Sequence, residues 1–162
     1  MLNELNRDEL FRILADIHFD ERYYALYEHF RDRSGNINYT QDDVMAALAG
    51  TGLDFSYHPR EKFYAYKEQH SSGTLGLHLA VPCSTVEFIL VLQSGGKEIG
   101  GPFPALARNT ALLRDPSFSY EPRSPKIPFA NLSELQQIVQ EGIALFQDIK
   151  RAFVVRSHTS QL

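Results

Sequence analysis

The sequence predicts an α+β fold: N-terminal helices, a central antiparallel β-meander of three to four strands, and a long C-terminal amphipathic helix packed on the sheet. Apolar residues recur at helical spacing in the first third and again after residue 131, whereas residues 62–103 alternate with the period of strands. The length of 162 residues fits one domain. We therefore assign residues 1–155 to a single domain and residues 156–162 to a flexible C-terminal tail.

Three helices are predicted before residue 50. Asn6 is a candidate N-cap for the first, whose apolar positions are Leu10, Ile13, Leu14 and Ile17. Asp20 can open the second helix, and the pair His18-Phe19 either breaks the first helix or continues it. The second helix carries an aromatic stripe of Tyr23, Tyr24, Tyr27 and Phe30. Thr40, followed three residues later by Asp43, predicts the start of the third helix.

Four strand-like runs follow, separated by short segments rich in Gly, Ser and Pro. They cover residues 62–69, 74–82, 85–93 and 97–103. Antiparallel pairing across these turns gathers the large apolar residues on one face: Tyr64, Tyr66, Leu75, Leu77, Leu79, Val81, Val86, Phe88, Leu90, Leu92 and Ile99. A register slipped by one residue would scatter this set, so we predict that this face packs against the core.

Helical signals return after the sheet. Residues 104–114 predict a short helix, and the four prolines within residues 115–128 predict an irregular crossing. Asn131 and Glu134 then form a capping pair. The apolar stripe that follows is Leu135, Ile138, Val139, Phe146, Ile149 and Phe153. A helix of this length, lying on the apolar face of the sheet, would supply most of the core.

Composition limits the classes of function. With 43% hydrophobic and 22% charged residues, the chain has the make-up of a soluble globular protein. Its net charge of −4 makes nucleic acid a poor candidate as a partner. The N-terminus lacks the features of a signal peptide, and no apolar run is long enough to span a membrane. We therefore expect a cytoplasmic protein with no nucleic-acid and no membrane partner.

The acidic side chains are concentrated at the N-terminal end. Residues 1–62 hold 12 acidic and 7 basic side chains, whereas residues 63–162 hold 8 acidic and 9 basic ones. This asymmetry is typical of a solvated helix face, and it also suits electrostatic docking of a basic partner.

The opposite face of the predicted sheet carries the candidate catalytic residues. Lys67, His78 and Glu87 fall on three adjacent strands with side chains on one face. A histidine beside a carboxylate can act as a general base, although a surface charge ladder would use the same residues. Cys83, in the turn after Pro82, is a second candidate partner for His78 because a Cys–His pair can form a nucleophilic thiolate. These residues define a hydrolase-like alternative.

Candidate binding residues lie on the same face, and Lys67 is one of them. Phe63, Ile89 and Val91 are apolar side chains at nominally exposed positions, so either another helix or a partner covers them. Tyr23 and Tyr27, in the aromatic stripe of the second helix, form a further candidate docking surface.

One candidate anion site and no metal site emerge from the sequence. Gly100 and Gly101 precede the helix that holds Arg108, and glycine-rich backbone at a helix N-terminus can bind an anion. The same glycines suit a strand end or a bulge. The six histidines show no pair at the spacing of zinc ligands, so we predict neither a metal nor a cofactor.

These observations favour a small, acidic, cytosolic, non-enzymatic protein-binding module. By analogy of size and charge it would be an inhibitor, an immunity protein or a chaperone. The alternative is a small hydrolase-like enzyme that uses His78 with Glu87 or Cys83. A homodimer that buries the second sheet face against itself is compatible with both.

Overall fold

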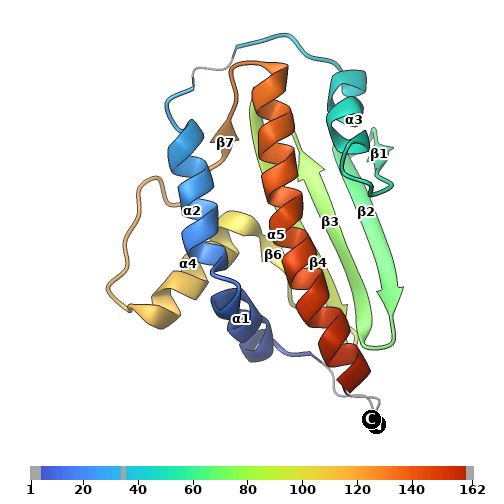
Figure 1. Ribbon diagram of the computed structural model, residues 1–162, viewed down its shortest axis with the longest axis vertical. Helices are drawn as coiled ribbons and strands as arrows, with labels where there is room; N and C mark the ends of the chain where they lie inside the picture. The colour runs from blue at the N-terminus through green and yellow to red at the C-terminus, as the bar shows by residue number, and fades with distance from the viewer. Residues whose placement is uncertain (1–4, 34–35, 160–162) are drawn as a thin grey trace.

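The computed structural model describes residues 5–33 and 36–159. Its helices lie on one face of an antiparallel sheet, so the described residues form two layers (Figure 1). Helix α5 lies over the sheet and runs roughly along its long strands, with α1, α2 and α4 on one side of it and α3 on the other. The described residues form five helices and seven strands. The predicted α+β class, with N-terminal helices, an antiparallel meander and a long C-terminal helix, is confirmed.

The helices are α1 (Arg7–Asp16), α2 (Phe19–Phe30), α3 (Gln41–Ala49), α4 (Phe103–Arg114) and α5 (Leu132–Thr159). The strands are β1 (Ser56–His58), β2 (Phe63–His70), β3 (Gly73–Ala80), β4 (Thr85–Ser94), β5 (Lys97–Glu98), β6 (Gly101–Pro102) and β7 (Ile127–Pro128). Strands β1 to β5 are neighbours in chain order, and β6 and β7 also pair with β4.

The sheet has more strands than the three to four predicted. Two strands, β1 and β7, were not predicted; they are only two or three residues long, so their sequences show no period of two. The predicted strand over residues 97–103 is divided between β5 and β6 by Gly100. A Cβ atom on Gly100 would lie 2.1 Å from the carbonyl oxygen of Leu90, so the close approach of this segment to β4 requires glycine.

The three long strands pair in a register that keeps the predicted apolar set together. Tyr66 pairs with Leu77, and Leu77 pairs with Leu90. The leucines on this face are at most 1% exposed, because α5 covers them. Gly142 of α5 sits directly over the ring of Phe88, so the helix and the sheet approach closely at this point.

Local capping groups fix where α1 and α3 begin. The Asn6 side chain accepts a hydrogen bond from the Glu9 amide at 2.9 Å, and Thr40 and Asp43 form a reciprocal capping box. His18 has a φ of 57°, in the left-handed region, so the chain leaves α1 and re-enters a helix at Phe19. The pair His18-Phe19 therefore breaks the first helix, which resolves the alternative left open by the sequence.

Helix α5 is longer than the sequence predicted. Its backbone is helical to Thr159, so residues 156–159 extend the helix rather than form a tail, and residues 160–162 lie outside the described residues. A Glu68 carboxylate near the C-terminal end of β2 binds the Lys150 ammonium at 2.9 Å and also the His70 ring. This contact ties the last turns of α5 to the sheet. No helix in the described ranges is long and apolar enough to cross a membrane.

Candidate functional site

The sheet has a second face that carries no helix within the described residues. Because strand side chains alternate, this face collects every other residue of β1 to β4, and it lies behind the strands in Figure 1. We call it the second face; its residues are Ser56, His58, Phe63, Ala65, Lys67, Gly76, His78, Ala80, Glu87, Ile89 and Val91. Phe63 and Ile89 are half-buried, whereas Val91 is only 4% exposed. The sequence placed Val91 in an exposed patch; it is instead buried.

A hollow of about 440 Å³ opens on the β1 side of the second face. It is lined by Asp54, Ser56, His58, Phe63, Ala65, Lys67 and His78. Small residues form the middle of this region: Ala65 pairs with His78, and Gly76 pairs with Lys67. The stem of Lys67 lies over Gly76, with its Cγ 2.9 Å from the point where a Cβ on Gly76 would stand. We call this feature the sheet hollow, and its volume is within the range of ligand sites.

Aromatic rings form one wall of the sheet hollow. The ring of Phe63 stacks on His58 with centroids 4.7 Å apart and on His78 with centroids 4.4 Å apart. The Nε2 atom of His78 is buried and has no hydrogen-bond partner among the described residues. An unpaired buried polar atom costs free energy, and the surrounding atoms shield this nitrogen from a molecule in the hollow.

The electrostatic surroundings keep His78 neutral. Burial lowers the pKa of His78, the charges of Lys67 and His58 lower it further, and Glu98 acts in the opposite direction. At neutral pH the ring is therefore uncharged, and Nε2 can either donate or accept a hydrogen bond according to the tautomer.

The predicted catalytic group is not assembled. Glu87 binds the ammonium of Lys126 at 2.8 Å, and Ile89 rather than Glu87 pairs with His78 across β3 and β4. Lys67 and His78 both line the sheet hollow, but Glu87 does not. Sequence reasoning missed Lys126, because it lies in the proline-rich crossing and is far from Glu87 in the chain.

Cys83 lies outside this hollow as well. It is exposed in the turn between β3 and β4 and has a φ of 50°. The hydroxyl that does line the hollow belongs to Ser56, whose Oγ lies 3.4 Å from His58 Nε2, which is long for a hydrogen bond. The alternation of Phe55 and Tyr57 with Ser56 and His58 is the sequence signal that would have placed these two polar residues together on the second face.

Tyr23 and Tyr27 form part of the core and not an exposed stripe, which corrects the sequence prediction. Tyr23 is 1% exposed and Tyr27 is 8% exposed. The Tyr23 hydroxyl donates a hydrogen bond to the carbonyl oxygen of Pro125 at 2.7 Å, and burial raises the pKa of Tyr23 far above its ordinary value. The proline-rich segment thus covers the aromatic side of α2 and removes it as a docking surface.

Arg108 lies in the second turn of α4, beside Tyr24. Burial raises the pKa of Tyr24, and the positive charge of Arg108 opposes that rise. Close packing on β4 explains why residue 100 is a glycine, so no bound anion is needed to explain it. Arg108 and the sheet hollow are on different elements, and the structure does not bring them together.

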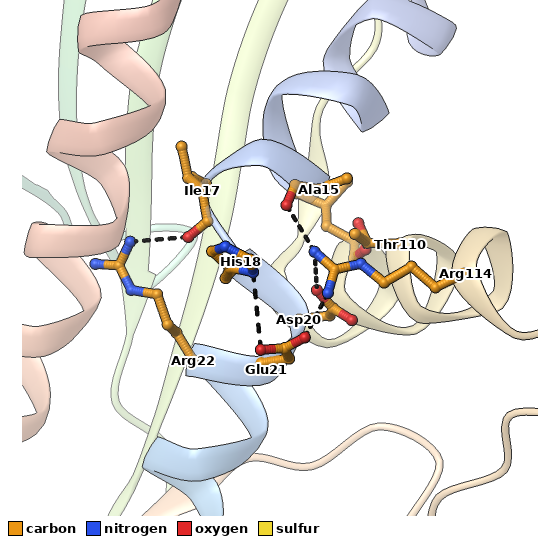
Figure 2. Close-up of polar contacts among 9 residues, drawn as sticks. Ala15, Ile17, His18, Asp20, Glu21, Arg22, Thr110 and Arg114 are labelled. Carbon is orange, nitrogen blue, oxygen red and sulfur yellow. Dashed lines mark hydrogen bonds and ion pairs between the residues drawn. The ribbon is translucent and has the colours of Figure 1, made fainter.

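Several N-terminal carboxylates are paired within the chain. Figure 2 shows Arg114 of α4 directed at the start of α2, where it contacts Asp20 at 3.5 Å and binds Glu21. The same guanidinium donates to the carbonyl oxygen of Ala15 at the end of α1, at 2.6 Å. We call these contacts the Arg114 cluster. Because the Arg114 cluster places a cation beside these acidic groups and joins three helices, its role is structural.

The described residues contain no group of three His, Cys, Asp or Glu side chains that could hold a metal ion. A search of protein-family models, of curated proteins and of solved structures found nothing that matches the chain.

Proposed function

We propose that the chain is a non-enzymatic protein-binding module that docks its partner on the second face of the sheet. The observation that carries the proposal is that this face has apolar side chains, a hollow and no covering helix among the described residues. Apolar surface of this kind is typical of interaction sites. The small size and the acidic charge suit a cytoplasmic inhibitor, immunity protein or chaperone.

The contacts around His78 favour binding over hydrolysis. A hydrolase would need a nucleophile and an orienting acid beside the imidazole. Glu87 is engaged by Lys126, and Cys83 is outside the sheet hollow. The stacked rings of His58, Phe63 and His78 are features that a bound partner segment can contact directly.

The proposal predicts that one charge on the second face abolishes capture of a partner. Purified wild-type chain and the Ile89→Arg variant are immobilised and exposed to native lysate at low and moderate salt. Ile89 is half-buried at the middle of the face, so an arginine there leaves an uncompensated charge in the interface. A stoichiometric partner should bind the wild type and not this variant.

The matched control is Ala144→Arg, which adds the same charge at an exposed position of α5, on the helical layer. This control should retain the partner, and circular dichroism should show that both variants are folded. Loss of the partner from the control, or equal capture by Ile89→Arg and the wild type, would contradict the proposal.

A further inference from the structure

Another hollow, of about 260 Å³, opens on the helical side of the sheet, where α3 begins beside β1 and β2 (Figure 1). Tyr57 and Tyr64 pair across these two strands, and their ring centroids are 4.7 Å apart in its wall. Val44, Val81 and Pro82 add apolar surface. We call this hollow the tyrosine pocket. No residue lines both it and the sheet hollow, so the two features are separate.

The hydroxyl of Tyr64 is a polar group left without a partner in this pocket. Tyr64 is 5% exposed, and its hydroxyl makes no hydrogen bond within the described part of the chain. Unlike the unpaired hydroxyl of Tyr24, it is not enclosed by protein atoms, so a ligand in the tyrosine pocket can reach it.

This hydroxyl is a hydrogen-bond donor at neutral pH. Burial raises the pKa of Tyr64 to about 12, and Tyr57 and Tyr39 act in the same direction. Asp42 adds the weakest contribution. The hydroxyl therefore keeps its proton, which it can donate to an acceptor on a ligand.

Lys62 carries the one charge among the described residues that line the tyrosine pocket. It is exposed, and its ammonium makes no ion pair with any described residue. Its φ of 58° lies in the left-handed region, which suits glycine or asparagine better than lysine. The turn between β1 and β2 thus gives no reason for a lysine, whereas an anion in the pocket would.

The first turn of α3 also favours negative charge in the tyrosine pocket. Thr40 and Gln41 line it, and the first amides of a helix have no acceptor within the helix. The two acidic residues of this turn do not occupy the pocket. Asp43 is engaged by the Thr40 amide in the capping box, and Asp42 is outside the lining.

We propose that the tyrosine pocket binds a small organic carboxylate, with its charge on Lys62 and the Tyr64 hydroxyl and its apolar body against the tyrosine rings. A carboxylate only accepts hydrogen bonds, which matches a pocket whose free groups donate them. The volume is below the range of drug-sized sites, so the ligand is of single-ring size. This site extends the properties of the protein beyond the proposed function, because it lies away from the second face.

The test uses benzoate, its neutral counterpart benzamide, and acetate. Each is titrated into the intact chain at constant ionic strength to about 20 mM, while NMR follows the backbone amides of Gln41 and Asp42. Benzoate should shift both amides saturably, with a Kd of about 1 mM. Benzamide should bind about tenfold more weakly because it lacks the charge, and acetate because it lacks the ring.

Two variants test the contacts, each with a matched control. Tyr64→Phe should weaken benzoate binding about fivefold without lowering stability in urea, because the hydroxyl has no partner in the chain. Its control is Tyr24→Phe, which removes an enclosed hydroxyl outside the pocket. Lys62→Asn should weaken binding about tenfold and preserve the turn. Its control is Lys97→Asn, at an exposed lysine of β5 outside the lining.

Both controls should bind benzoate like the wild type. Ile89→Arg should do so as well, because Ile89 is outside the tyrosine pocket, so the docking proposal and this inference are tested independently. Equal binding of benzoate and benzamide, or no shift of either amide, would overturn the inference. An affinity for benzoate that is unchanged by Tyr64→Phe and by Lys62→Asn would overturn it too.

Discussion

Replacing Gly142 with alanine is expected to lower the free energy of unfolding by about 2 kcal/mol, although alanine is the better helix former by roughly 1 kcal/mol. A Cβ atom at this position would lie 2.1 Å from Cζ of Phe88. Phe88 is 1% exposed and packs against Phe103, so its ring has no free space into which to move. The overlap must therefore separate α5 from the sheet or distort the core.

Urea denaturation of the purified chain measures this change. Gly50→Ala is the matched control, because nothing lies closer than 3.9 Å to its added Cβ and its φ of −71° suits alanine. That variant should be unchanged or slightly more stable. Adding Phe88→Leu to Gly142→Ala should restore part of the loss. A Gly142→Ala variant as stable as wild type would mean that α5 does not pack this closely on β4.

Replacing Arg114 with methionine is expected to cost about 3 kcal/mol of stability, since it leaves a buried carboxylate without its cation. The Asp20 side chain is 6% exposed, and the guanidinium of Arg114 contacts it at 3.5 Å. Methionine keeps much of the apolar stem, so the loss reports on the charge and on the hydrogen bond to Ala15.

Two further variants test this explanation by the same denaturation measurement. Arg31→Met removes the partner of Glu28 in a pair whose side chains are 38% and 48% exposed, and it should cost far less because water screens that pair. Asp20→Asn combined with Arg114→Met should recover part of the stability by removing the unpaired charge. If Arg114→Met loses no more stability than Arg31→Met, then Arg114 does not compensate a buried charge at the start of α2.

The regular elements could be predicted because their signals are local. Thr40 and Asp43 lie three residues apart, and both halves of their capping box form as expected. Antiparallel pairing of the long strands across their turns also placed Phe63, Lys67 and His78 on one face.

The contacts between distant segments could not be predicted in this way. Nothing near Glu87 in the sequence indicates that Lys126 neutralises it, and nothing near Tyr23 indicates that the Pro125 carbonyl accepts its hydroxyl. Both contacts depend on where the proline-rich crossing runs over the surface. The short strands β1 and β7 were missed for the same reason, since they are held by pairing with β2 or β4 rather than by their own pattern.

The central claim is that the second face is open in the free chain and closed by a partner. We would measure thiol labelling of the Ile89→Cys variant and of the neighbouring Leu90→Cys variant, each in a Cys83→Ser background that removes the native thiol. These adjacent positions point to opposite faces of β4, and Leu90 is 1% exposed beneath the helices.

The thiol of the Ile89→Cys variant should be labelled rapidly in the free chain and slowly once the captured partner is bound. The thiol of the Leu90→Cys variant should be labelled slowly in both states. If the two variants are labelled equally slowly in the free chain, the second face is already covered. If Ile89→Cys is labelled at the same rate with and without the partner, the partner docks elsewhere.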